Sequence, residues 1–202
     1  MPDNVSIKPY SESCEQNREP ILSVIKPILE AAGSVLEVGS GTGQHAVYFA
    51  SMMPHLHWYT SDCASHLQGI NLWIAEAGLG NVHAPFELDV SSSSWPLFDV
   101  DAIFSANSFH IMSELDAENM MAGSGLLLKA QGSLIIYGPF NYDGEYTSES
   151  NRRFDDWLKG GDPESGIKDF EWINELASQH GMTLVKDYEM PANNRILHFS
   201  KL

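Results

Sequence analysis

A glycine-rich turn follows an apolar run near the first third of the chain. Residues 35–43 read VLEVGSGTG. Three glycines within five positions let the backbone turn tightly after a strand and let a ligand approach it closely. Such turns bind several kinds of cofactor, and Gly41, Gly43 and Ala46 also fit the dinucleotide pattern G-x-G-x-x-G/A. The glycines alone therefore do not identify the ligand.

Carboxylates surround this turn in the sequence and narrow the choice of ligand. Glu37 precedes the first glycine by two residues, and Asp62 and Asp89 follow two later apolar runs. Between Lys26 and Lys129 the chain has eleven Asp and Glu but no Lys or Arg. A pyrophosphate would be disfavoured here, whereas an ammonium or sulfonium group would be favoured. S-adenosylmethionine carries both groups, while an acidic, solvated surface is the alternative explanation for most of these carboxylates.

The composition excludes several classes of protein. The chain has 202 residues, 27 Asp and Glu against 11 Lys and Arg, and a net charge of −16. Such an excess of negative charge argues against nucleic acid and anionic membranes as partners. The two cysteines, Cys14 and Cys63, form no CxxC pair, and the histidines show no metal-ligand spacing, so we predict no metal. The chain start lacks the pattern of a signal peptide, and no apolar run reaches about 18 residues, so we expect a cytoplasmic protein.

Hydrophobic periodicity predicts alternating strands and helices. Strands are predicted at 34–38, 57–61, 82–88, 100–106, 133–137, 183–189 and 195–200, and helices at 21–32, 44–53, 65–77, 116–129, 151–159 and 168–180. The first five strands suit a parallel sheet with helices on both faces, and the short turn between the last two permits only an antiparallel pair. Residues 1–17 are predicted to be a loose arm, and Pro27 to kink the first helix.

The glycine-rich segment supports a definite resemblance. Residues 37–43, EVGSGTG, resemble motif I of the class I S-adenosylmethionine-dependent methyltransferases. The resemblance implies a Rossmann-like α/β fold with a mostly parallel seven-stranded sheet and a C-terminal antiparallel hairpin. It also implies that Gly39, Ser40, Gly41 and Gly43 contact the methyl donor with Glu37.

The same resemblance assigns roles to the two aspartates. Asp62 lies where the family places an acid on the ribose hydroxyls, and Asp89 where it often places one near the adenine amino group. The segment after Asp62, Cys63-Ala64-Ser65, departs from the Ile/Val-Asp expected there.

A narrower resemblance covers nearly the whole chain. Five segments are similar to the DUF938 (UPF0585, methyltransferase-like 26) family: NREPIL at 17–22, GTGQH at 41–45, SD at 61–62, YGPF at 137–140 and MPANN at 190–194. This family resemblance implies the fold and the donor, S-adenosylmethionine, with S-adenosylhomocysteine as product. It implies no methyl acceptor.

Four further residues are candidates for contacts with the methyl donor or with the methyl acceptor. Arg18 is the nearest cation that could meet the methionine carboxylate of the donor, although it could equally be a surface arginine. Asn107 and His110 follow the fourth strand, where amino-group methyltransferases carry Asn/Asp-Pro-Pro-Tyr. We expect Asn107 and Tyr137 to orient the acceptor and His110 to act as a general base with a near-neutral pKa. A strand-capping Asn107 and a His110 packed over the donor are the alternative.

These observations favour one function over two others. A single domain, 1–202, is expected to transfer a methyl group to a small neutral or cationic molecule, held partly by a lid at 141–166. A non-catalytic S-adenosylmethionine-binding protein that acts through a partner would instead lack an open acceptor cavity. A nicotinamide dehydrogenase is disfavoured by Glu37 and by the C-terminal hairpin. The oligomeric state is not predicted.

Overall fold

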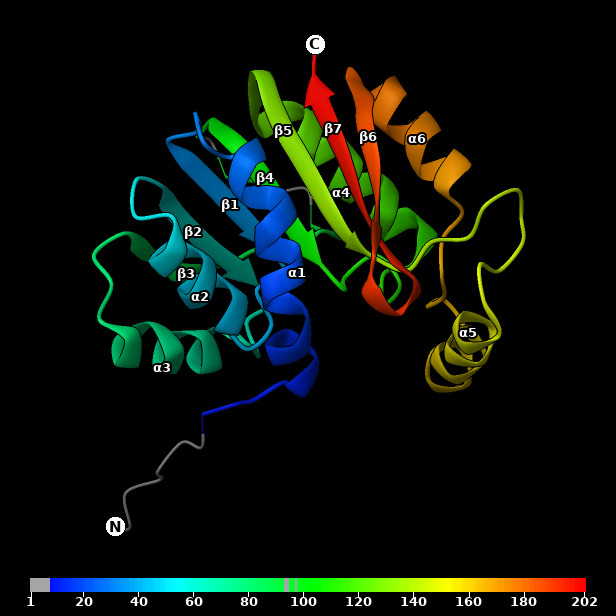
Figure 1. The fold of residues 1–202 in the computed structure, drawn as a ribbon, viewed down its shortest axis with the longest axis horizontal. Coiled ribbons are helices and arrows are strands. Elements are labelled where there is room, and N and C mark those ends of the chain that lie inside the picture. Colours follow the sequence, from blue (N-terminus) through cyan, green and yellow to red (C-terminus); the bar gives the residue numbers. More distant parts are fainter. Residues whose placement is uncertain (1–7, 93–94, 97) are drawn as a thin grey trace.

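A single seven-stranded sheet runs through the molecule (Figure 1). The computed structural model describes residues 8–92, 95–96 and 98–202. The strands are β1 (Ser34–Val38), β2 (His57–Asp62), β3 (Val82–Glu87), β4 (Val100–Ala106), β5 (Leu128–Gly138), β6 (Met182–Met190) and β7 (Asn194–Lys201). Their order is β3-β2-β1-β4-β5-β7-β6, with β1 to β5 parallel and β7 antiparallel to both neighbours. The expected parallel sheet with a C-terminal antiparallel hairpin is therefore present.

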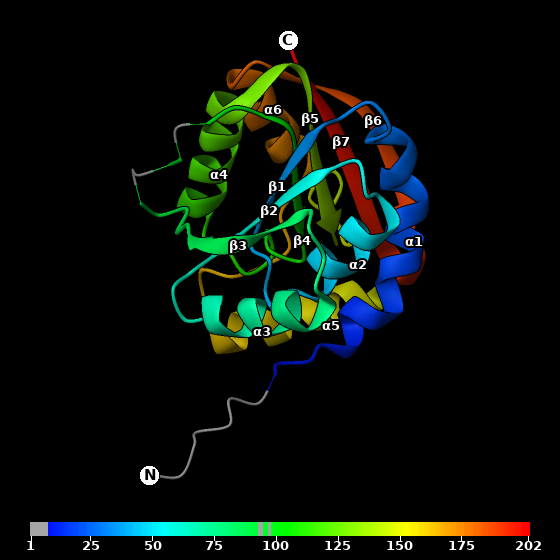
Figure 2. The same cartoon turned by 90° about the vertical axis from the view of Figure 1, so that its left-hand side faces the viewer.

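Helices cover both faces of this sheet. They are α1 (Glu12–Ile28), α2 (Gln44–Met52), α3 (Leu67–Ala77), α4 (Glu114–Leu127), α5 (Glu149–Gly161) and α6 (Phe170–Gln179), with a 3-10 turn, η1 (Pro191–Asn193), in the hairpin. Figure 2 shows α1 and α2 on one face and α4 and α6 on the other, with α3 and α5 near the carboxyl ends of the strands. Among the described residues, none of the helices has the length and apolarity that a membrane crossing requires.

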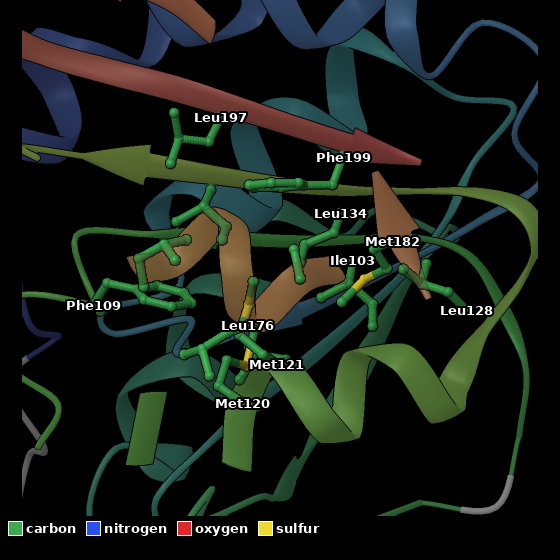
Figure 3. Packing of buried hydrophobic residues seen from close by; sticks show 14 of the residues in the cluster. Ile103, Phe109, Met120, Met121, Leu128, Leu134, Leu176, Met182, Leu197 and Phe199 are labelled. Carbon is green, nitrogen blue, oxygen red and sulfur yellow. The ribbon is translucent and has the colours of Figure 1, made fainter. Parts of the chain in front are cut away.

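Each face of the sheet carries its own apolar core. On one face, Met120 and Met121 of α4 and Leu176 of α6 pack against Ile103 and Phe199 of the sheet (Figure 3). On the other face, the buried side of α1 and α2 packs against Trp58 and Phe104 of the central strands. A sheet buried on both faces explains the continuous apolar character of β1 and β4. It also holds the carboxyl ends of the parallel strands at one edge, where ligands of open α/β sheets bind.

The first helix differs from the prediction at both ends, because it spans Glu12–Ile28 where the sequence predicted residues 21–32. α1 begins at Glu12, where the Ser11 side chain caps it, so residues 12–17 are helix and not a loose arm; residues 1–7 lie outside the described part. Pro20 lies inside the helix and Pro27 lies next to its last residue. A proline inside a helix costs about 3 kcal/mol. Here the buried stripe of Ile21 and Ile25 against the sheet offsets that cost.

The fifth strand is longer than predicted. β5 starts at Leu128, immediately after α4 ends at Leu127, whereas periodicity placed its start at residue 133. The strand bends at Gln131, whose φ of 66° is left-handed, before Gly132. The chain therefore passes from helix to strand without a polar loop, and no turn signal marked the boundary.

Candidate active site

The glycine-rich turn takes the conformation that its sequence predicts. Gly39, Gly41 and Gly43 have φ values of 77°, 58° and 91°, in the left-handed region. A Cβ on Gly39 would lie 2.5 Å from the Ser108 Oγ, so only glycine fits there. A Cβ on Gly41 would meet no atom within 4 Å, because that side of the turn faces open space. The turn therefore packs against the protein at Gly39 and leaves its backbone accessible to a ligand at Gly41.

Asp62 holds this turn in place. Its Oδ2 accepts a hydrogen bond from the Gly41 backbone N–H at 2.7 Å, while Oδ1 accepts from the Cys63 backbone N–H at 2.7 Å and from the His66 ring at 2.6 Å. The residue is only 7% exposed. A carboxylate has about four acceptor positions, so one remains for a ligand beside these three bonds. Asp62 therefore links the end of β2 to the glycine turn.

A cavity of about 390 Å³ opens between the glycine turn, the end of β4 and the first turn of α1. This cavity, which we call the donor cavity after the ligand that the sequence predicts, is lined by Gly39, Ser40 and Gly41, by Asp62 and Asp89, by Asn107, and by Ser11 and Cys14 of α1. It brings together Gly39 and Gly41 with the two aspartates that the sequence singled out, whereas Gly43 packs against Ile70 of α3 and does not line it. Asp116, at the start of α4, also lines it and was not predicted. No Lys or Arg is among the described residues of its wall.

Glu37 lies beneath the turn and not on the cavity wall. Its carboxyl group is 1% exposed, and its Oε2 accepts a hydrogen bond from the Trp58 indole N–H at 3.1 Å. Burial raises the pKa of Glu37 to about 8. Glu37 therefore supports the end of β1 from beneath the turn. Its predicted direct charge contact with the ligand is not seen in this geometry, because the carboxyl group does not reach the cavity wall.

Arg18 does not lie on the wall of the donor cavity, and its contact with the methionine carboxylate stays a prediction. Its guanidinium pairs with Glu15 at 2.5 Å and stacks on the Tyr48 ring, 4.6 Å from the ring centroid. It lines a separate surface hollow between α1 and α2 and not the donor cavity. The reason is the helical conformation of residues 12–17, which turns Arg18 toward α2.

A second, larger cavity of about 670 Å³ adjoins the first. Asn107 and Ser13 line both of them. The walls of this acceptor cavity come from α1 (Ser13, Gln16, Asn17, Pro20), the ends of β4 and β5 (Asn107, His110, Tyr137, Pro139), α5 (Ser150, Asn151, Phe154) and the hairpin turn (Pro191, Ala192, Asn193, Asn194). Asn107, His110 and Tyr137 therefore lie together, as predicted. The hairpin turn was not expected here, although MPANN was one of the segments that marked the family resemblance.

His110 is neutral at physiological pH. It is 8% exposed, and burial together with the Lys168 ammonium lowers its pKa to about 4. Its ring meets the Phe154 ring edge to face, with centroids 5.1 Å apart. The expectation of a near-neutral pKa is therefore wrong, because the ring is desolvated and lies near a cation.

Strained backbone gathers around the acceptor cavity. The described residues include five non-glycine residues with left-handed φ, and three of them, Asn107, Ala192 and Asn193, line this cavity. Such conformations persist where the surrounding structure enforces them, and they cluster at binding sites. The backbone N–H of Asn107 donates to the Tyr137 carbonyl at 2.8 Å, which holds the two strand ends together.

Two polar residues of α5, Asp155 and Asn151, secure this helix beside the cavity. Asp155 is fully buried and accepts hydrogen bonds from the Tyr146 hydroxyl, the Lys159 ammonium and the Ile167 backbone N–H, each at 2.6 Å. The Asn151 amide donates to the Asn193 carbonyl at 3.2 Å and so joins α5 to the hairpin turn. The predicted lid, residues 141–166, is therefore held in place by contacts of α5 with the hairpin turn and with the loop that follows α5.

Comparison with known sequences places the chain in a family. The profile of the DUF938 family, described as a protein of unknown function, matches residues 8–201. The chain belongs to the DUF938 family. The matched range includes the residues that line both cavities, among them the hairpin turn on the wall of the acceptor cavity.

Comparison with solved structures identifies the fold. An O-methyltransferase family protein from Burkholderia thailandensis matches with a TM-score of 0.83 at 16% identity, over 94% of this chain and 57% of the other. The S-adenosylmethionine-dependent methyltransferase SibL matches with a TM-score of 0.79 at 21% identity, over 94% and 55%. Human N-acetylserotonin methyltransferase, solved in complex with S-adenosylmethionine, matches with a TM-score of 0.75 at 14% identity, over 94% and 53%.

These likenesses concern the fold. The DUF938 chain has the class I methyltransferase fold and spans slightly more than half the length of each of these three proteins. The predicted fold class is confirmed by this agreement in strand order and hairpin.

Proposed function

We propose that this DUF938 protein transfers a methyl group from S-adenosylmethionine to a small-molecule acceptor. One observation carries the proposal: two cavities of different chemistry meet at Asn107, at the carboxyl ends of the parallel strands. Methyl transfer requires two bound molecules whose reacting atoms approach in line, and adjoining cavities provide that arrangement.

The donor cavity suits S-adenosylmethionine. The open side of the glycine turn admits close approach to the backbone, and Asp62 and Asp89 supply carboxylates for the ribose and the adenine amino group. The negative wall favours the ammonium and sulfonium groups of this donor over a pyrophosphate. When bound, the donor supplies a methyl group that its sulfonium has already activated.

The acceptor cavity supplies the groups that would orient the second molecule. Tyr137 keeps its proton at neutral pH, because burial raises its pKa, and it offers a hydroxyl donor. His110 offers a neutral ring that accepts a proton, and Asn107 offers an amide at the junction of the cavities. An open cavity beside the donor cavity supports catalysis over the alternative of a purely donor-binding protein.

A crystal structure with S-adenosylhomocysteine tests this assignment. The product should lie along the glycine turn with its ribose at Asp62 and its sulfur toward Asn107. A product bound elsewhere, or with its sulfur pointing away from the acceptor cavity, would contradict the proposed function.

A further inference from the structure

The two cavities differ sharply in charge. Asp62, Asp89 and Asp116 line the donor cavity, whereas none of the described residues around the acceptor cavity is Asp, Glu, Lys or Arg. Charged residues make up 19% of the chain, so a wall of this size without any of them is a distinct feature. Moving an ion into such a site without a counter-charge is costly. The acceptor cavity therefore discriminates against anions and cations alike.

The apolar part of the acceptor cavity is made of rings. Phe154, Tyr137 and His110 contribute aromatic rings, and Pro20, Pro139 and Pro191 contribute flat aliphatic ones. Trp157 stacks behind Phe154, with centroids 6.0 Å apart and planes 14° apart, and so supports that wall. Flat surfaces of this kind pack well against an aromatic ring.

The polar part of the cavity offers one hydrogen-bond donor and one acceptor near the ends of β5 and β4, namely Tyr137 and His110. His45 has its pKa lowered to about 4 by burial, and its Nε2 lies 2.7 Å from the Asn17 Oδ1, which can only accept. Burial raises the pKa of Tyr137, an effect that the nearby Asn17 side chain only partly offsets, so Tyr137 keeps its proton at neutral pH. Tyr137 lines the cavity, and its hydroxyl can donate this proton to a bound molecule.

His110 supplies the hydrogen-bond acceptor of the cavity. Neither nitrogen of its ring hydrogen-bonds to a described residue, and a neutral imidazole keeps one nitrogen as an acceptor. A hydroxyl group is both donor and acceptor, so it satisfies Tyr137 and His110 together. A carboxylate cannot donate to His110, and an aliphatic amine carries a positive charge at neutral pH. An aromatic amine is uncharged, but its delocalised lone pair accepts a hydrogen bond from Tyr137 only weakly.

We propose that the methyl acceptor is an uncharged aromatic compound and that its reacting group is a hydroxyl. This inference rests on the proposed function and names the substrate class for the same site. The acceptor oxygen gains the methyl group and loses its proton to His110, while the donor sulfur keeps the electron pair of the broken carbon–sulfur bond. The proton becomes strongly acidic as the new carbon–oxygen bond forms, so a weakly basic His110 suffices to take it.

Equilibrium binding of three naphthalene probes tests the inference without any turnover. The probes are 2-naphthol, 2-naphthoate and 2-naphthylmethylammonium, titrated into the full chain by calorimetry. We expect 2-naphthol to bind at least about tenfold more tightly than either ion. An ion that binds as tightly as 2-naphthol, or a failure of all three probes to bind at millimolar concentration, would overturn the inference.

Two variants sharpen the test. Tyr137→Phe should weaken 2-naphthol by about fivefold through loss of one hydrogen bond and leave S-adenosylmethionine affinity unchanged. Asn193→Asp, at an exposed left-handed position of the wall that aspartate tolerates, should shift the preference toward the ammonium probe. Asn71→Asp on the exposed surface of α3 makes the same change in net charge and should leave all three affinities unaltered. An equal response of Asn71→Asp and Asn193→Asp would contradict a local charge effect.

The proposed function and this inference can fail separately. If the probes follow the expected order but S-adenosylmethionine does not bind, the substrate-class inference stands for the cavity and the proposed reaction fails. If S-adenosylmethionine binds but an ionic probe is preferred, the reaction stands and the inference fails.

Discussion

At the scale of single residues, Asp62 combines two tasks. It pins the glycine turn through Gly41 and faces the donor cavity with its remaining acceptor position. Asp62→Ala should weaken S-adenosylmethionine binding by about 1.5–3 kcal/mol, the range for hydrogen bonds to charged groups. Calorimetry measures the affinity, and Asp99→Ala, an exposed aspartate outside the described cavity wall, is the matched control for net charge. An unchanged affinity in Asp62→Ala would remove Asp62 from the site.

His110 should act in turnover more than in donor binding. His110→Gln should lower kcat with 2-naphthol by about 100-fold, the lower end for proton-transfer catalysis, and leave the donor affinity nearly unchanged. Release of S-adenosylhomocysteine measures kcat. Because the His110 pKa is about 4, the native rate should show no inflection from this residue between pH 6 and 8. Full activity in the variant would contradict the role, and His57→Gln, an exposed histidine, serves as the control.

Residue types and spacing predicted most of the donor side of the site. Gly39, Gly41, Asp62 and Asp89 follow the strands that carry them, and their place in the fold follows from the strand ends alone. Arg18 could not be placed this way, because its direction depends on where α1 begins. The burial of Glu37 also escaped the sequence, since Trp58, its partner, comes from another strand.

At the scale of elements, the boundaries of β1 and β4 agree with the prediction because each is a mostly apolar run that ends at a turn residue, Gly39 or Asn107. α1 starts before the predicted residue 21 because the helix continues through Pro20, where tertiary packing of Ile21 and Ile25 offsets the cost of the proline. The hairpin turn at 191–194 reaches the acceptor cavity only because α5 folds back against it through Asn151, a long-range pairing that no local pattern shows.

The anchoring of α5 gives a prediction for this element. Asp155→Ala should destabilise the protein by about 2–3 kcal/mol, because it leaves the buried Ile167 N–H and the half-buried Tyr146 hydroxyl without their acceptor. It should also speed hydrogen exchange at the Ile167 N–H. Asp156→Ala, at the next position, removes only an exposed pair with Arg152 and should change neither value measurably. Urea unfolding and hydrogen exchange check both variants, and equal effects would contradict the anchoring.

At the scale of the whole molecule, stability should depend on pH through three buried groups. His45 and His110 have pKa values of about 4, below the usual 6.5, so the unfolded chain binds more protons and stability is lost as pH falls from about 6.5 to 4. Glu37 has a pKa of about 8, above its usual 4.5, so the folded chain binds more protons and stability is lost as pH rises toward 8.

Between pH 6.5 and 8 the Glu37 effect should dominate. The unfolding free energy should fall by about 1.5 kcal/mol over this interval, and Glu37→Gln should remove most of that fall. Urea unfolding at the two pH values measures both proteins. A native protein whose stability is flat or rises over this interval, or a variant that keeps the full decrease, would contradict a protonated Glu37 beneath the glycine turn.

The distribution of charge over the whole chain supports the proposal that the donor cavity binds S-adenosylmethionine. A net charge of −16 comes with a donor cavity whose described charged residues are all carboxylates, and with a glycine turn open on one side. This arrangement favours a cationic nucleoside ligand over a pyrophosphate-containing one.

Calorimetric titration of the full chain with S-adenosylmethionine, S-adenosylhomocysteine and NAD tests that claim most directly. S-adenosylmethionine and S-adenosylhomocysteine should each bind at one site per chain, and NAD should give no binding heat. Binding of NAD, or the absence of binding by both sulfur compounds, would contradict the account.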